Sequence, residues 1–173
     1  MKRLWIKTLI FCVCSVVVMA VPAQESAENT NITETNYQDW LVRCEQIEGT
    51  GERCVMTQLA QLEETGEWLM QANIAYIPER AEPIMSIILP LGVALPEGVK
   101  LQLGEADENA NVLSFSHCEP GGCYVNQLLA EEAIQRITAV ESGSVTFATI
   151  QGEAIEVPFS PQGFAEALAA LRE

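Results

Sequence analysis

The sequence predicts a mainly β fold: a β-sandwich of about nine short antiparallel strands with two short helices, one of them C-terminal. The clearest indication is period-two alternation over residues 67–77, where Trp68, Met70, Ala72 and Ile74 fall on one side. A second indication is that short apolar runs are separated by turn sequences containing Gly or Pro. This pattern is typical of two antiparallel sheets packed face to face.

Nine segments carry the strand pattern. In residues 39–45, Trp40, Val42 and Cys44 share one side. Residues 84–89 are an uninterrupted apolar run that ends at Pro90, which predicts a strand buried on both faces. The remaining predicted strands are residues 53–60, 67–77, 99–103, 112–118, 123–128, 145–150 and 154–159.

Two segments have helical spacing instead. Residues 128–140 place Leu129, Ala133 and Ile137 on one face, which predicts an amphipathic helix. At the C-terminus, Ser160 is predicted to cap a second helix that has Pro161 in its first turn.

Residues 1–23 have the features of a secretory signal peptide. Three basic residues precede an apolar run that ends at Val21-Pro22-Ala23, with short side chains where a signal peptidase reads the chain. The run is too short to span a bilayer comfortably, because a spanning helix needs about 20 apolar residues. Polar residues 24–36 are expected to be a disordered leader, and residues 37–173 to form a single β-sandwich domain.

The chain is strongly acidic, with 9 Lys and Arg against 24 Asp and Glu and a formal charge of −15. Lys2, Arg3 and Lys7 would leave with the signal peptide, so that 6 basic residues and a charge of −18 remain. Phosphates and anionic lipids repel such a chain, and we therefore expect no nucleic-acid binding and no electrostatic docking on a membrane. The acidity is expected to serve solubility, with an acidic face for a basic partner as the alternative.

Four cysteines lie outside the signal peptide: Cys44, Cys54, Cys118 and Cys123. An even number in an exported chain predicts two disulfides. Three pairings are open. The local one, Cys44–Cys54 with Cys118–Cys123, is favoured because Gly-containing turns bring the ends of both loops together. A zinc site or a redox-active dithiol would need closely spaced C-x-x-C pairs, whereas nine and four residues intervene here.

Five sequence landmarks occur in a characteristic order. They are residues 39–44 (Asp-Trp-Leu-Val-Arg-Cys), 54–56, 89–99, the dipeptides His117-Cys118 and Gly122-Cys123 taken together, and residues 163–168. Together they resemble the invasion-associated locus B family of exported bacterial proteins. The most specific landmark is residues 89–99, Leu-Pro-Leu-Gly-Val-Ala-Leu-Pro-Glu-Gly-Val, and the resemblance covers roughly residues 37–172. Gln162 stands where members often have Lys.

The resemblance implies a periplasmic, outer-membrane-associated or secreted protein. The family is named for entry of a pathogen into host red cells, yet many relatives occur in free-living bacteria. It has no established catalytic residues, so the resemblance implies no active site, cofactor or metal ion.

The residues themselves predict no catalytic, cofactor or metal site either. His117 is the sole histidine and adjoins Cys118, which is expected to be oxidised, so an ordinary position at a strand end is predicted. The carboxylate clusters Glu63-Glu64-Glu67 and Glu105-Asp107-Glu108 lack the alternating ligand spacing of a calcium loop. They are expected to be solvated turns.

The apolar candidates point to binding instead of chemistry. Trp40 and Trp68 are expected to pack in the core, with an aromatic binding patch as the alternative. Pro and Gly punctuate the run that contains Leu91, Val93 and Leu95, which predicts an apolar loop. The loop either plugs the end of the sandwich or offers a partner-contact surface.

These observations predict a non-enzymatic exported protein that binds another envelope or host-surface protein. The alternative is a periplasmic accessory or chaperone-like factor in envelope biogenesis. A hydrolase or a thiol oxidoreductase is the least favoured class.

Overall fold

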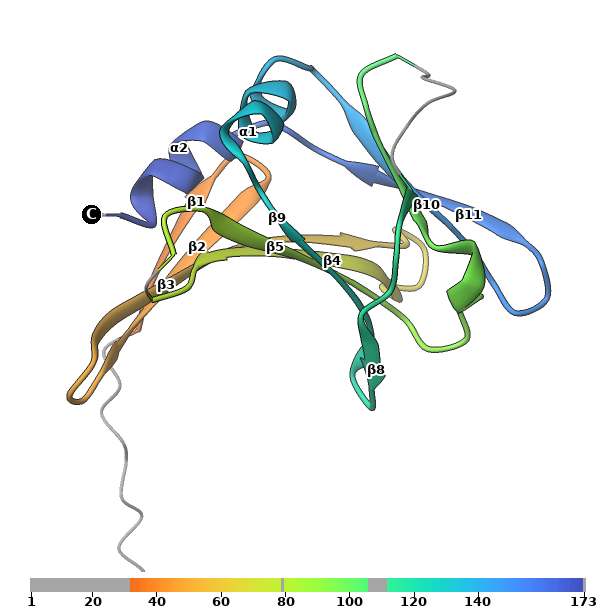
Figure 1. Ribbon diagram of the computed structural model, residues 1–173, viewed down its shortest axis with the longest axis horizontal. Helices are drawn as coiled ribbons and strands as arrows, with labels where there is room; N and C mark the ends of the chain where they lie inside the picture. Colours follow the sequence, from red (N-terminus) through yellow and green to blue (C-terminus); the bar gives the residue numbers. More distant parts are fainter. Residues whose placement is uncertain (1–31, 79, 106–111, 173) are drawn as a thin grey trace, which may run out of the picture.

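Eleven strands in two antiparallel sheets dominate residues 32–78, 80–105 and 112–172, which this computed structural model describes (Figure 1). In spatial order the larger sheet contains β1 Ile32–Tyr37, β2 Trp40–Ile47, β3 Gly51–Gln61, β4 Trp68–Tyr76, β5 Pro83–Leu89, β9 Gly122–Leu128 and β8 His117–Glu119. The smaller sheet contains β11 Ala154–Phe159, β10 Gly143–Ala148, β6 Val99–Leu103 and β7 Val112–Leu113. The helices are α1 Glu131–Thr138 and α2 Phe164–Ala170, with a 3₁₀ turn, η1, at Leu95–Glu97. The predicted mainly β architecture with two sheets and two helices is confirmed.

The core lies between the two sheets and is built from alternate residues of each strand. On β4, Met70, Ala72 and Ile74 are fully buried, as their period-two spacing predicts. The smaller sheet contributes Val145 of β10 and Phe159 of β11 to the same core. Within the described residues, no helix has both the length and the apolar character needed to cross a bilayer.

The expectation that residues 84–89 are buried on both faces is wrong. Met85, Ile87 and Leu89 face the core, whereas Ile84 and Ile88 are only half-buried. An antiparallel sheet of a sandwich packs on one side only, so alternate residues of an apolar strand remain partly in contact with water.

The prediction of a disordered leader over residues 24–36 is wrong for residues 32–36, which belong to strand β1. Residues 32–37 pair with β2 without a break in register, from Ile32 opposite Glu45 to Tyr37 opposite Trp40. The side chains of β1 are almost all exposed, so the strand has no apolar alternation to reveal it, and main-chain hydrogen bonds to β2 define it. Residues 24–31 and the predicted signal peptide lie outside the described residues.

The single strand predicted at residues 112–118 is two strands in different sheets. Strand β7 pairs with β6 in the smaller sheet, whereas β8 pairs with β9 in the larger one. The chain crosses between the sheets over residues 114–116. This division adds one strand and β1 adds another, so eleven strands stand against the predicted nine.

Ser160 has a different role from the predicted helix cap. The N-cap of α2 is Gly163, whose φ of 81° is left-handed. A Cβ atom at Gly163 would also overlap the carbonyl oxygen of Tyr37, so this position requires glycine. Helix α2 therefore begins later than predicted, close against the β1–β2 turn.

Ser160 instead joins the end of β11 to the larger sheet, in a contact that we call the Ser160 junction (Trp40, Gln58 and Ser160). The carbonyl oxygen of Ser160 accepts hydrogen bonds from Trp40 Nε1 at 3.0 Å and Gln58 Nε2 at 2.9 Å. Its amide donates to Gln58 Oε1 at 2.9 Å. The Trp40 ring also packs edge-on against Phe159 and Phe164, at centroid distances of 5.8 and 5.5 Å. Trp40 is therefore a core residue, as expected, while Trp68 is half-buried.

Both disulfides have the favoured local pairing. Cys44 of β2 is bonded to Cys54 of β3, and Cys118 of β8 to Cys123 of β9. Each bond joins residues directly opposite each other in the sheet, with Cα atoms 4.0 Å apart. The disulfides therefore reinforce two hairpins of the larger sheet.

Candidate functional site

The loop that carries the predicted contact residues Leu91, Val93 and Leu95 is fixed to the β10–β11 hairpin. Val93 forms an isolated antiparallel bridge with Thr149. The Ala94 amide donates to the Ala148 carbonyl at 2.8 Å. On the other side of the bridge, the Ile150 amide donates to the Gly92 carbonyl at 2.9 Å. The loop is therefore held as a short strand-like edge at one end of the sandwich, on the right in Figure 1.

The three predicted contact residues of the loop differ in their exposure to solvent. Val93 is 7% exposed and belongs to the core, so it plugs the end of the sandwich. Leu91 and Leu95 are 59% and 48% exposed and face solvent. A third exposed large apolar residue at this end, which sequence reasoning missed, is Ile150, at 69%. The sequence signal for Ile150 was an apolar residue at the end of the predicted strand 145–150, directly before Gln151 and Gly152.

We call Leu91, Leu95 and Ile150 the apolar tip. Isolated exposed leucines are ordinary on protein surfaces. Here the two loops that carry the three side chains are joined by main-chain hydrogen bonds, which fixes the loops relative to each other. Loops that are already held in place lose little main-chain entropy on binding, which favours association with another surface.

A second candidate is a Ser–His–carboxylate group on β8 and the residue before it. Ser116 Oγ lies 3.0 Å from His117 Nδ1, and His117 Nε2 lies 3.5 Å from Glu119 Oε1. This is the order of groups that nucleophilic hydrolysis uses. Sequence reasoning considered His117 alone and missed the Ser-His-x-Glu spacing around it.

The hydrogen bonds of Ser116 oppose a nucleophilic role. Its hydroxyl donates to the Tyr124 carbonyl at 2.8 Å and accepts from Asn126 Nδ2 at 3.1 Å. A hydroxyl has one proton, and in this arrangement that proton is directed at the Tyr124 carbonyl and not at His117 Nδ1. The His117 ring is stacked on the Tyr124 ring, with centroids 4.7 Å apart. The group thus stabilises the β8–β9 hairpin.

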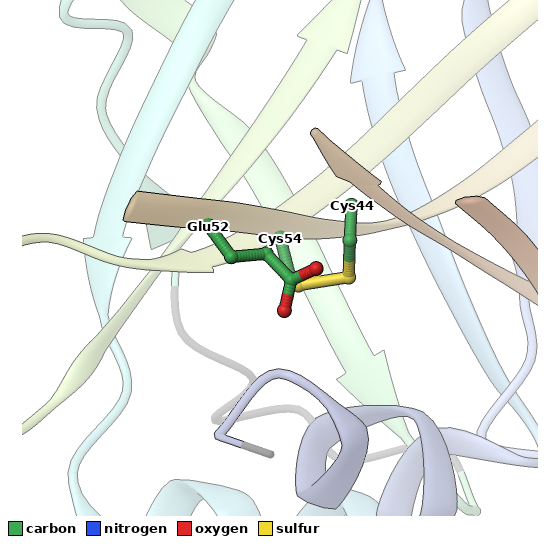
Figure 2. Close-up of side chains that lie close together, drawn as sticks. All are labelled: Cys44, Glu52 and Cys54. Atoms are coloured by element: carbon green, nitrogen blue, oxygen red, sulfur yellow. A yellow bond between two sulfur atoms is a disulfide. The ribbon is translucent and has the colours of Figure 1, made fainter. Parts of the chain in front are cut away.

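A third group combines Cys44, Glu52 and Cys54, whose potential ligand atoms all lie within 4.8 Å of one another (Figure 2). The two sulfur atoms form the disulfide, and a disulfide has no thiolate to offer a metal ion. Glu52 is also occupied, because its Oε1 accepts a hydrogen bond from Gln46 Nε2 at 2.8 Å. The oxidised group therefore does not form a metal site.

The predicted carboxylate clusters are solvated where the structure describes them. Glu63, Glu64 and Glu67 are exposed around the turn between β3 and β4. Glu105 is exposed as well, whereas Asp107 and Glu108 lie outside the described residues.

Comparison with known proteins places the chain in a family. The family model described as Invasion associated locus B (IalB) protein matches residues 40–172. The chain belongs to the invasion associated locus B family. The match contains the apolar tip, both disulfides and the Ser116–Glu119 group, while β1 precedes it.

A solved structure of the invasion associated locus B type has a similar fold. The crystal structure of invasion associated protein B from Bartonella henselae superposes with a TM-score of 0.67 at 16% sequence identity. The similarity covers 81% of this chain and 95% of that chain. At this identity the likeness establishes the shared fold alone. No curated protein matches the sequence.

Proposed function

We propose that this protein is exported to the cell envelope and acts by binding another protein through the apolar tip, without catalysing a reaction. The observation that carries the proposal is the exposure of Leu91, Leu95 and Ile150 on two loops that main-chain hydrogen bonds hold together. The formal charge of −15 favours a partner whose apolar pocket is ringed by basic residues.

Export is supported by the disulfides and by the pattern of the N-terminal sequence. Two disulfides persist in an oxidising compartment such as the periplasm and are rare in the cytosol. Residues 1–23 carry the charge and apolar pattern of a secretory signal. Fractionation of the native host would test this part. The oxidised protein is expected in the periplasmic, outer-membrane or secreted fraction, and recovery in the cytosol with reduced cysteines would contradict it.

The non-enzymatic part of the proposal is supported by the bonding of Ser116. Its hydroxyl proton is held by the Tyr124 carbonyl, so the Ser–His–carboxylate group serves to fasten a hairpin. A panel of ester and peptide substrates is expected to give no turnover above buffer. Hydrolysis that is lost in both Ser116→Ala and His117→Ala would refute this part.

The binding role can be tested by photo-crosslinking in the native host. A photoreactive phenylalanine analogue at Ile150 is expected to capture one discrete envelope or host-surface protein. The matched control places the same analogue at Glu48, an exposed residue in the turn between β2 and β3, away from the tip in Figure 1. The control is expected to give no such product.

A second variant tests whether the apolar side chains themselves are responsible. Leu91→Ser combined with Leu95→Ser removes two exposed apolar side chains while the buried Val93 and its bridge to Thr149 remain. The variant is expected to fold normally and to lose the Ile150 cross-link. Capture of many unrelated envelope proteins would favour the chaperone-like alternative. Equal cross-linking at Ile150 and Glu48 would contradict binding through the tip.

A further inference from the structure

The molecule has a cavity that is separate from the apolar tip. It has a volume of about 600 Å³, within the range of roughly 300–1,000 Å³ that is usual for small-molecule sites. Its walls come from both sheets and from α1, and they are mostly aliphatic. The apolar lining residues include Met85, Leu101, Leu103, Leu113, Leu129 and Ile137.

The cavity opens where the two sheets separate near α1. On β6 the inward-facing Val99 is fully buried, but the next inward residues, Leu101 and Leu103, are only half-buried. On β9 the buried Val125 is followed two positions later by the exposed Gln127. Core-facing apolar surface is therefore accessible from outside at this edge, which is the usual setting for an apolar ligand.

A single cation stands among the described lining residues. Arg136 of α1 lines the cavity and is exposed, and none of the described lining residues is acidic. Within the described residues, Arg136 has no carboxylate within the 4.0 Å that defines an ion pair and makes no side-chain hydrogen bond. In a chain of charge −15, an arginine at the mouth of an aliphatic cavity sets a local preference for an anion.

We propose that this cavity binds an anionic amphiphile, a molecule with one hydrocarbon chain and a carboxylate head group. The hydrocarbon chain would occupy the aliphatic interior around Leu101 and Leu103, which removes apolar surface from water. The head group would remain at the mouth and accept hydrogen bonds from the Arg136 guanidinium, whose planar fork fits a carboxylate. The site goes beyond the proposed protein-binding role, because none of the three tip residues lines it.

The test uses the purified protein with both disulfides formed and dansyl-undecanoate, a fluorescent fatty acid, as the probe. Saturable 1:1 binding is expected, with displacement by laurate. Dodecanol has the same chain length but no charge. It is expected to compete about tenfold more weakly, because a charge-assisted hydrogen bond at an accessible site contributes roughly one factor of ten.

Two variants examine the head group. Arg136→Gln is expected to abolish the tenfold preference for laurate over dodecanol while dodecanol binding stays unchanged. Arg43→Gln is the matched control, because Arg43 lies on β2, which contributes no residue to the cavity wall. The control is expected to keep the preference. A preference that persists in Arg136→Gln would overturn the assignment of the head group.

Two further variants examine the cavity itself. Leu101→Trp fills it from β6, and Ala133→Phe fills it from α1, where the native side chain is only half-buried. Either variant that retains the native near-ultraviolet circular dichroism is expected to weaken probe binding at least tenfold. Probe binding that is unchanged in a folded filled variant, or no saturable binding to the parent protein, would overturn the proposal.

Discussion

The Ser160 junction gives a sharp test of how the two sheets are held together. Gln58 is 5% exposed, and its amide group makes two hydrogen bonds to the main chain of Ser160. The change Gln58→Met keeps the length and approximate volume of the side chain but removes both the donor and the acceptor. It therefore isolates the hydrogen bonds from the packing.

The expected loss follows from the geometry. Each hydrogen bond contributes about 1 kcal/mol net, so two contribute about 2 kcal/mol. The Ser160 carbonyl keeps its bond from Trp40 Nε1, but the Ser160 amide loses its acceptor and adds a penalty of about 1 kcal/mol. Burial of the apolar methionine offsets part of this loss. The free energy of unfolding should therefore fall by about 2–3 kcal/mol.

Equilibrium unfolding in urea, followed by tryptophan fluorescence and far-ultraviolet circular dichroism, measures this difference. Gln61→Met is the matched control, because Gln61 lies on the same strand and is exposed. It should change the free energy of unfolding by less than about 0.5 kcal/mol. If Gln58→Met is no more destabilising than Gln61→Met, the junction does not hold the sheets together in the way described.

Four other changes test separate parts of the structure by the same unfolding measurement. Trp40→Phe removes the indole hydrogen bond and leaves a void, and it should cost about 2–3 kcal/mol; a cost under about 1 kcal/mol would show that the ring is replaceable. Gly163→Ala should cost about 3 kcal/mol or more, because its left-handed backbone and contact with the β1–β2 turn exclude a side chain; wild-type stability would refute this. Ser116→Ala should cost only about 1 kcal/mol, since the network it serves is exposed. Replacing Cys118 and Cys123 together by Ala should cost about 2 kcal/mol, the chain-entropy value for so short a loop, and an unchanged midpoint would contradict that account.

The parts of the fold that were predictable are those in which side-chain burial follows directly from spacing. Strand β4 was visible because every second residue from Met70 to Ile74 is buried, and burial is what the alternation of the sequence encodes. Strand β1 was not visible because its pairing depends on main-chain groups, which are the same for every sequence. The division of residues 112–118 was hidden for a related reason. An extended segment does not specify which sheet it joins.

The candidate site, too, was predictable only in part. Leu91 and Leu95 were predictable from the sequence, because an apolar run interrupted by Pro and Gly is typical of a loop with apolar side chains. Ile150 could not be assigned to the same end, since that assignment requires knowing that the Gly92 carbonyl meets the β10–β11 turn. The state of Ser116 was equally inaccessible, because its proton is held by a carbonyl eight positions away.

The surroundings of Trp40 also govern the order in which the protein can fold. The ring is fully buried, yet its hydrogen-bond acceptor lies 120 positions further along the chain. Ribosomes add about 5–20 residues per second, so roughly 6–24 s separate the synthesis of Trp40 from that of its partner. During that interval the Trp40 ring lacks both its hydrogen-bond acceptor and the rings of Phe159 and Phe164 against which it packs. The burial of Trp40 is therefore completed only when nearly the whole length of the chain is available, whereas the hairpins from β1 to β5 pair strands that are neighbours in the sequence.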